Sequence, residues 1–225
     1  MKLSYVHLYS SYFSIPLATE ILNRLQIILP LIKIDLKSSR EYFSKNMIAD
    51  DNGGKLVSQL AKDSFQHFDV EKTSSIVDTN GIIIDGFYLQ RIYTNFIDKN
   101  EIHLEHIHII FEDKLVCTFD EIDRRFHARP IICGSPTIIS IPSIVEGPAK
   151  PKAYYFKHMM KDLLSENSKE IDNEFANRYV RNDDPRMPQI AAGYAIQAIF
   201  FFLLMVTPFA QIILVDCSIL IGRKS

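Results

Sequence analysis

Three histidines lie in one short stretch, IHLEHIHIIF (102–111), which alternates apolar and polar residues as a β-strand does. In a strand, His106 and His108 share one face and His103 lies on the other. Two histidines at i and i+2 can bind zinc when another strand supplies a third ligand. His127, on a later predicted strand, completes a predicted metal site. The alternative, which the mixed pattern of the stretch favours, is an ordinary amphipathic strand with a polar face toward solvent.

The segment TFDEIDRRFHAR (118–129) is the part of the chain densest in functional side chains, with Asp120, Asp123, Arg125, His127 and Arg129. Carboxylates and guanidinium groups in one exposed loop can form bidentate pairs with each other or with a ligand. The segment is equally well interpreted as a surface hairpin held by salt bridges that contribute little stability. Both interpretations stay open at the level of sequence.

The elements that would position these residues indicate an α/β (or α+β) single domain. Strand, helix and strand patterns at 3–8, 17–29 and 31–36 predict an N-terminal β-α-β unit with a right-handed crossover. A central, mostly antiparallel sheet is predicted at 102–141, with a hairpin turn at 112–114. Helices are expected mainly toward the C-terminus; the predicted helices are 56–65, 88–96, 154–164, 170–180 and 187–203.

Composition excludes several classes of function. The chain has 225 residues and a net charge of −2 with no basic block, so it lacks the electrostatic signature of a nucleic-acid-binding protein. Three cysteines, Cys117, Cys133 and Cys217, do not form a disulfide framework. The N-terminus has no clean apolar run of a secretory signal, and a cytoplasmic location is expected. The sequence does not identify a partner.

Common catalytic motifs are missing from the sequence: it has no H-E-x-x-H, Walker A, G-x-G-x-x-G, C-x-x-C or G-x-S-x-G. The block 108–156, however, contains FDEIDRRFHAR and IVEGPAKP, and through these motifs it resembles an archaeal family of metallopeptidase-like proteins. A weaker likeness covers most of 1–203, and the archaemetzincins are more distantly similar. The resemblance implies a zincin-like α/β domain and zinc as the cofactor of the family.

The chain departs from this resemblance in its last helix. Gln197-Ala198-Ile199-Phe200-Phe201 stands where a zincin has its paired histidines, and none of these residues can bind zinc as those histidines do. We therefore expect a degenerate active site that has lost zinc and catalysis. The alternative is a non-enzymatic binding or regulatory protein on the same scaffold, with the 118–129 loop as its contact surface.

The C-terminal tail is apolar and carries no charge between Ile190 and Leu214, which is long enough to span a membrane. Codons can be chosen for 204–225 so that reading one base earlier gives NPFC, a C-x4-C pair and RLFN-x-HWQEE, which are similar to the ending of the family. We interpret 1–203 as the domain and 204–225 as an aberrant frameshift product. A tail-anchored membrane protein is the disfavoured alternative.

Overall fold

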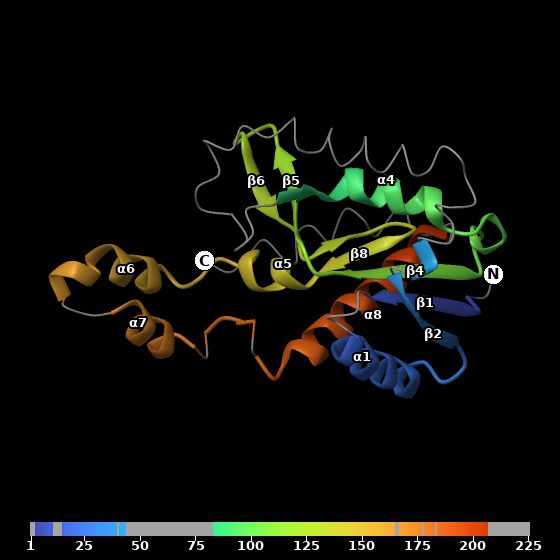
Figure 1. Ribbon diagram of the computed structural model, residues 1–225, viewed down its shortest axis with the longest axis horizontal. Helices are drawn as coiled ribbons and strands as arrows, with labels where there is room; N and C mark the ends of the chain where they lie inside the picture. Colours follow the sequence, from blue (N-terminus) through green and yellow to red (C-terminus); the bar gives the residue numbers. More distant parts are fainter. Residues whose placement is uncertain are drawn as a thin grey trace.

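The N-terminal β-α-β unit is present as predicted. The computed structural model (Figure 1) describes residues 3–10, 15–39, 41–43, 83–164, 167–176, 178–182 and 184–206. Strand β1 (Tyr5–Ser10), helix α1 (Ile15–Ile28) and strand β2 (Lys33–Ser38) follow one another, and β1 pairs in parallel with β2. Both faces of β1 are buried, whereas β2 at the edge of the sheet is partly exposed.

A five-stranded sheet forms the centre of the molecule, in the order β2-β1-β4-β8-β7. Strands β4 (His106–Glu112) and β8 (Thr137–Ser140) continue the parallel pairing from β1, and β7 (Ile131–Ile132) is antiparallel to β8 at the edge. The mixed α/β fold class is confirmed.

A second, three-stranded sheet has the order β3-β5-β6, from β3 (Ile83–Asp85), β5 (Leu115–Asp120) and β6 (Arg125–Ala128). The prediction of a β4–β5 hairpin was wrong, because β4 has a parallel neighbour on each side and no free edge for β5. The turn after β4 instead leads the chain from the first sheet into the second. The antiparallel pairing predicted for this region holds for β5 with β6 and for β7 with β8.

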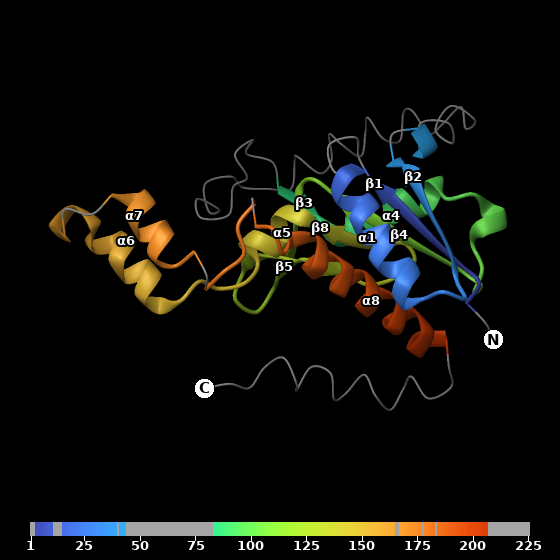
Figure 2. The ribbon, with the colours of Figure 1, turned by 90° about the horizontal axis from the view of Figure 1, so that it is seen from below.

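Helices α1 and α8 (Met187–Val206) cover one face of the five-stranded sheet (Figure 2). Their buried side chains join those of the strands in one core, which includes Ile109, Ala191, Ala195 and Ala198. The part of α8 from Met187 to Met205 is long and apolar enough to cross a membrane, and core helices of other proteins can have the same length and composition. The face of α8 with Ala191, Ala195 and Ala198 is buried in this core, whereas Phe200 and Met205 are more than half exposed.

Helix α4 (Gly86–Phe96) lies over the opposite face, toward β7 and β8, and matches the helix predicted at 88–96. Asp85 caps it by accepting a hydrogen bond from the Tyr88 amide. The helix comes so close to the sheet at Gly86 that an added Cβ would lie 2.7 Å from Ile132. Helix α5 (Ile141–Glu146) follows β8 directly and was not predicted.

Helices α6 (Lys152–Leu164) and α7 (Ser168–Glu174) form a pair that extends away from the two sheets (Figure 1). α6 matches the predicted helix at 154–164, whereas α7 ends earlier than the predicted 170–180. Asn167 and Glu170 form a capping box that fixes the start of α7. The helix predicted at 56–65 lies outside the described residues, as does the tail from 207 onward.

Candidate functional site

The face of the sheet opposite α1 and α8 is polar and aromatic where strands β2, β1 and β4 meet. Parallel register sets His7 beside Asp35 on one neighbouring strand and beside His108 on the other. Alternate residues of a strand share a face. The same face therefore presents a cluster, here called the histidine cluster, of Tyr5, His7, Tyr9, Asp35, Lys37, His106 and His108.

His7 is buried and joins the two outer strands of the cluster. Its Nδ1 lies 2.7 Å from the Asp35 carboxylate, and its Nε2 lies 2.8 Å from Nδ1 of His106. Since a carboxylate only accepts, His7 donates through Nδ1, and Nε2 of the neutral ring accepts from His106. Burial raises the pKa of Asp35, but the hydrogen bond from His7 and the charge of Lys37 outweigh it, and the pKa lies below its ordinary value.

His108 is fully buried, and its tautomer follows from its partners. Its Nε2 lies 3.0 Å from the backbone carbonyl of Glu101, so Nε2 carries the proton and donates. Its Nδ1 then accepts from the Tyr9 hydroxyl at 2.8 Å. Burial lowers the pKa of His108 to about 4. Burial also raises the pKa of Tyr9, so both groups are neutral near pH 7.

Glu101 reaches the cluster from a single-turn helix, η3 (Lys99–Glu101). Its carboxylate accepts from the Lys37 ammonium at 3.1 Å and from the Tyr42 hydroxyl at 2.9 Å. Burial raises the pKa of Glu101, but these two hydrogen bonds outweigh the effect and leave the pKa below its ordinary value. The Glu101 carboxylate is therefore ionised near pH 7.

Three residues of this region offer ligand atoms for a metal ion. One ligand atom each from His7, Glu101 and His108 lie within 4.8 Å of one another. Two imidazole nitrogens and one carboxylate oxygen are a ligand set that zinc accepts in proteins. The donor set thus fits the metal that a metallopeptidase-like protein would hold, although Lys37 already neutralises the carboxylate.

A second group lies on the turn between β5 and β6, where Asp120, Asp123 and His127 also have ligand atoms within 4.8 Å of one another. The Asp123 carboxylate lies 2.7 Å from Nε2 of His127 and accepts from the Arg125 amide. Asp120 accepts from the Ile122 amide. These bonds stabilise the turn itself, and the group is partly exposed.

The structure divides the histidines that the sequence grouped. His106 and His108 share the face predicted for them, but His127 belongs to the second group on the other sheet. The metal role of these three residues stays a prediction. Sequence reasoning missed His7 and Glu101; the alternation in LSYVHL placed His7 on a definite strand face, but nothing in the sequence gave its register with β4.

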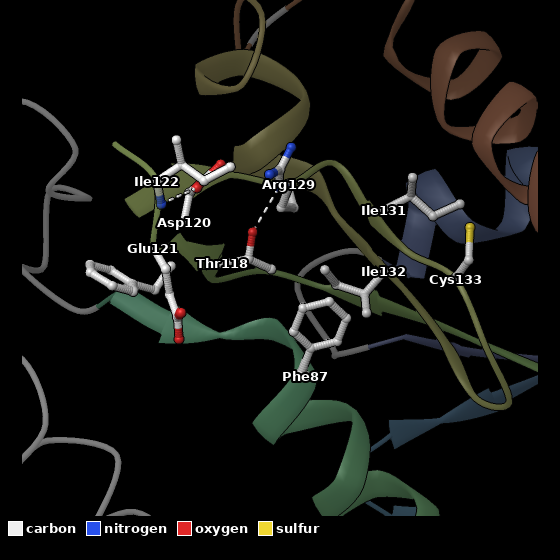
Figure 3. Close-up of a pocket in the computed structure, with 10 residues that line it drawn as sticks. Phe87, Thr118, Asp120, Glu121, Ile122, Arg129, Ile131, Ile132 and Cys133 are labelled. Atoms are coloured by element: carbon white, nitrogen blue, oxygen red, sulfur yellow. Dashed lines mark hydrogen bonds between the residues drawn. The ribbon is translucent and has the colours of Figure 1, made fainter. Parts of the chain in front are cut away.

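An open groove of about 600 Å³ borders the turn after β5 (Figure 3). Helix α4 contributes Phe87, and the edge strand β7 contributes two isoleucines, followed by Cys133. Arg129 also lines the groove, and its guanidinium donates to the Thr118 hydroxyl at 2.8 Å. The groove is lined by Phe87, Thr118, Phe119, Asp120, Glu121, Ile122, Arg129, Ile131, Ile132 and Cys133. Of the predicted loop residues, the groove therefore includes Asp120 and Arg129.

Helix α8 contains no metal ligand, since none of its 20 residues is His, Cys, Asp or Glu. No curated protein and no solved structure matches the chain significantly. The model of a family described as "Probable metallopeptidase family (DUF6775)" matches residues 23–212, which include β4, the 118–129 loop and α8. The match covers most of the chain, which therefore belongs to this probable metallopeptidase family.

Proposed function

We propose that this chain is a zincin-like member of its family that does not hydrolyse peptides and does not retain zinc on its last helix. The composition of α8 is the observation that carries the proposal. A zinc peptidase needs ligands that hold the ion and a base that acts on its bound water. On α8, Gln197 and Tyr194 are the only side chains after Gln189 with polar atoms, and neither supplies a zincin's ligand or base.

The arrangement around α8 supports the zincin-like part of the proposal. The helix follows the sheet in sequence and packs beside α1 on a mixed five-stranded sheet with one antiparallel edge strand. The archaeal origin, the distant likeness to archaemetzincins and the cytoplasmic location rest on the sequence motifs and composition alone. The frameshift interpretation of 204–225 likewise rests on sequence, because most of this tail lies outside the described residues.

A peptidase assay tests the loss of catalysis. We expect the purified full chain, with zinc added, to cleave a quenched fluorescent peptide library no faster than buffer does, because α8 cannot activate a zinc-bound water. A known zinc peptidase is the positive control for the assay. Cleavage that coelutes with the chain, is abolished by a chelator and returns with zinc would contradict the proposal.

The groove favours a second candidate function, the binding of an extended peptide. Strand β7 is the edge of its sheet, and an extended segment can add to such an edge while its side chains enter neighbouring pockets. Phe87 and the isoleucines of β7 offer apolar contacts, and Arg129 offers a charge for a carboxylate. The binding or regulatory alternative predicted from the 118–129 loop thus gains a defined surface.

A matched pair of exposed phenylalanines tests this candidate. Phe87 lines the groove and is 58% exposed, whereas Phe156 is 62% exposed on α6, away from the groove. For a peptide selected by display on the full chain, Phe87→Ala is expected to weaken binding about tenfold or more in fluorescence polarisation, because truncating an aromatic anchor removes apolar contact. Phe156→Ala should leave the affinity unchanged. Equal effects of both substitutions would exclude the groove as the site.

A further inference from the structure

The strongest unassigned feature is the centre of the histidine cluster. His7 and His108 are direct neighbours in the parallel register of β1 and β4, and their rings stack with centroids 4.9 Å apart. Both side chains are buried, and the Glu101 carboxylate closes the same space from η3. Two buried imidazoles and one carboxylate thus bring together the nitrogen and oxygen donors that transition metals take in proteins.

We propose that His7, His108 and Glu101 bind a divalent transition-metal ion, with zinc as the test ion. Their ligand atoms already lie within 4.8 Å of one another, and imidazole with carboxylate suits zinc. Because the site lies across the sheet from α8, it is independent of the lost peptidase centre and can stabilise or regulate the fold without hydrolysis. His7 also precedes the residues 23–212 that define the family match.

The contacts around His7 prepare it as a ligand. Asp35 holds its Nδ1 proton at 2.7 Å and so leaves Nε2 as the basic nitrogen. A carboxylate on the far nitrogen of a metal-binding histidine is the usual second partner at such sites, and it orients the ring and raises its basicity. At present Nε2 accepts from Nδ1 of His106. Metal binding would replace this hydrogen bond.

Lys37 acts as the competitor of the metal. Its ammonium lies 3.1 Å from the Glu101 carboxylate and is 3.7 Å from Asp35. In the metal-free chain it supplies the positive charge that these two carboxylates require. A metal ion bound to Glu101 has to displace or repel this charge, so removal of Lys37 should strengthen metal binding while removal of a ligand weakens it.

Zinc titration of the full chain, made without a polyhistidine tag and stripped with a chelator, tests the proposal. We expect the chain to bind one zinc ion in competition with a chromophoric chelator. The cobalt-substituted chain should absorb visible light, and the ligand substitutions given next should alter its spectrum. Glu101→Gln should weaken zinc binding at least about 100-fold, and Asp35→Asn about 10- to 100-fold. Lys37→Met should strengthen it about tenfold, and His127→Gln in the second group should change nothing.

Glu101 and Asp35 are not fully buried, so their isosteric substitutions leave the core intact, and circular dichroism of the metal-free variants checks the fold. Absence of zinc binding by the unmodified chain would overturn the proposal. Zinc binding that is unchanged in Glu101→Gln and Asp35→Asn, or that is lost in His127→Gln, would also overturn it. The peptidase assay is a separate measurement, so either proposal can fail without the other.

Discussion

Replacing Ile109 by Ala is expected to lower the free energy of unfolding by about 2–5 kcal/mol, the range for truncating a large buried aliphatic side chain. Ile109 lies on β4 in the middle of the five-stranded sheet and is completely buried in the core beneath α1 and α8. Its loss would leave a cavity between strands that are paired on both sides and cannot close it. Urea unfolding followed by circular dichroism measures the change.

Ile122 gives the matched control, since it is the same residue type but 96% exposed on the turn after β5. Ile122→Ala should change the free energy of unfolding by no more than about 0.5 kcal/mol. Similar losses for Ile109→Ala and Ile122→Ala would mean that β4 is not at the centre of the core.

Enlarging Ala195 to Leu is expected to destabilise the fold by about 1–3 kcal/mol, because the added atoms enter a packed interior. Ala191, Ala195 and Ala198 are completely buried on the face of α8 that packs against the sheet and α1. Small side chains there let the helix approach closely. Thermal or urea unfolding of the full chain measures the effect.

Gly193 tests the same helix from its outer face. A Cβ added at Gly193 meets nothing within 4 Å. Gly193→Ala should therefore stabilise the fold by about 0.5–1 kcal/mol, because alanine loses less backbone entropy in a helix. Opposite signs for Ala195→Leu and Gly193→Ala would confirm which face of α8 is buried. A neutral Ala195→Leu would show that this face is open, as a membrane anchor would require.

The hydrophobic pattern of the sequence was sufficient to predict the strands and helix of the N-terminal β-α-β unit. Alternation in LSYVHL and LIKIDL predicted β1 and β2, and the spacing of apolar residues between them predicted α1. Short elements escaped prediction: β3 has three residues, and α5 has six residues that follow β8 directly. For β4, a compact turn suggested a hairpin, but the strand found parallel partners far away in the chain.

The candidate site was predicted only in part for the same reason. The sequence placed His106 and His108 on one face because their relation is local. Their relation to His7 depends on which strands become neighbours and in which register, and no local pattern encodes that choice. The 118–129 segment was recognised by its density of charge, and the groove beside it depends on α4 and β7 from other parts of the chain.

The central position of β1 also has a consequence for the order in which the chain folds. β1, α1 and β2 are contiguous and can associate early, but the other edge of β1 pairs with β4, and His7 meets His106 across 99 residues of sequence. Closing so long a loop before its contacts form is entropically costly, and parallel sheets of this kind fold slowly. During synthesis the free edge of β1 stays open to other extended chains until β4 has left the ribosome.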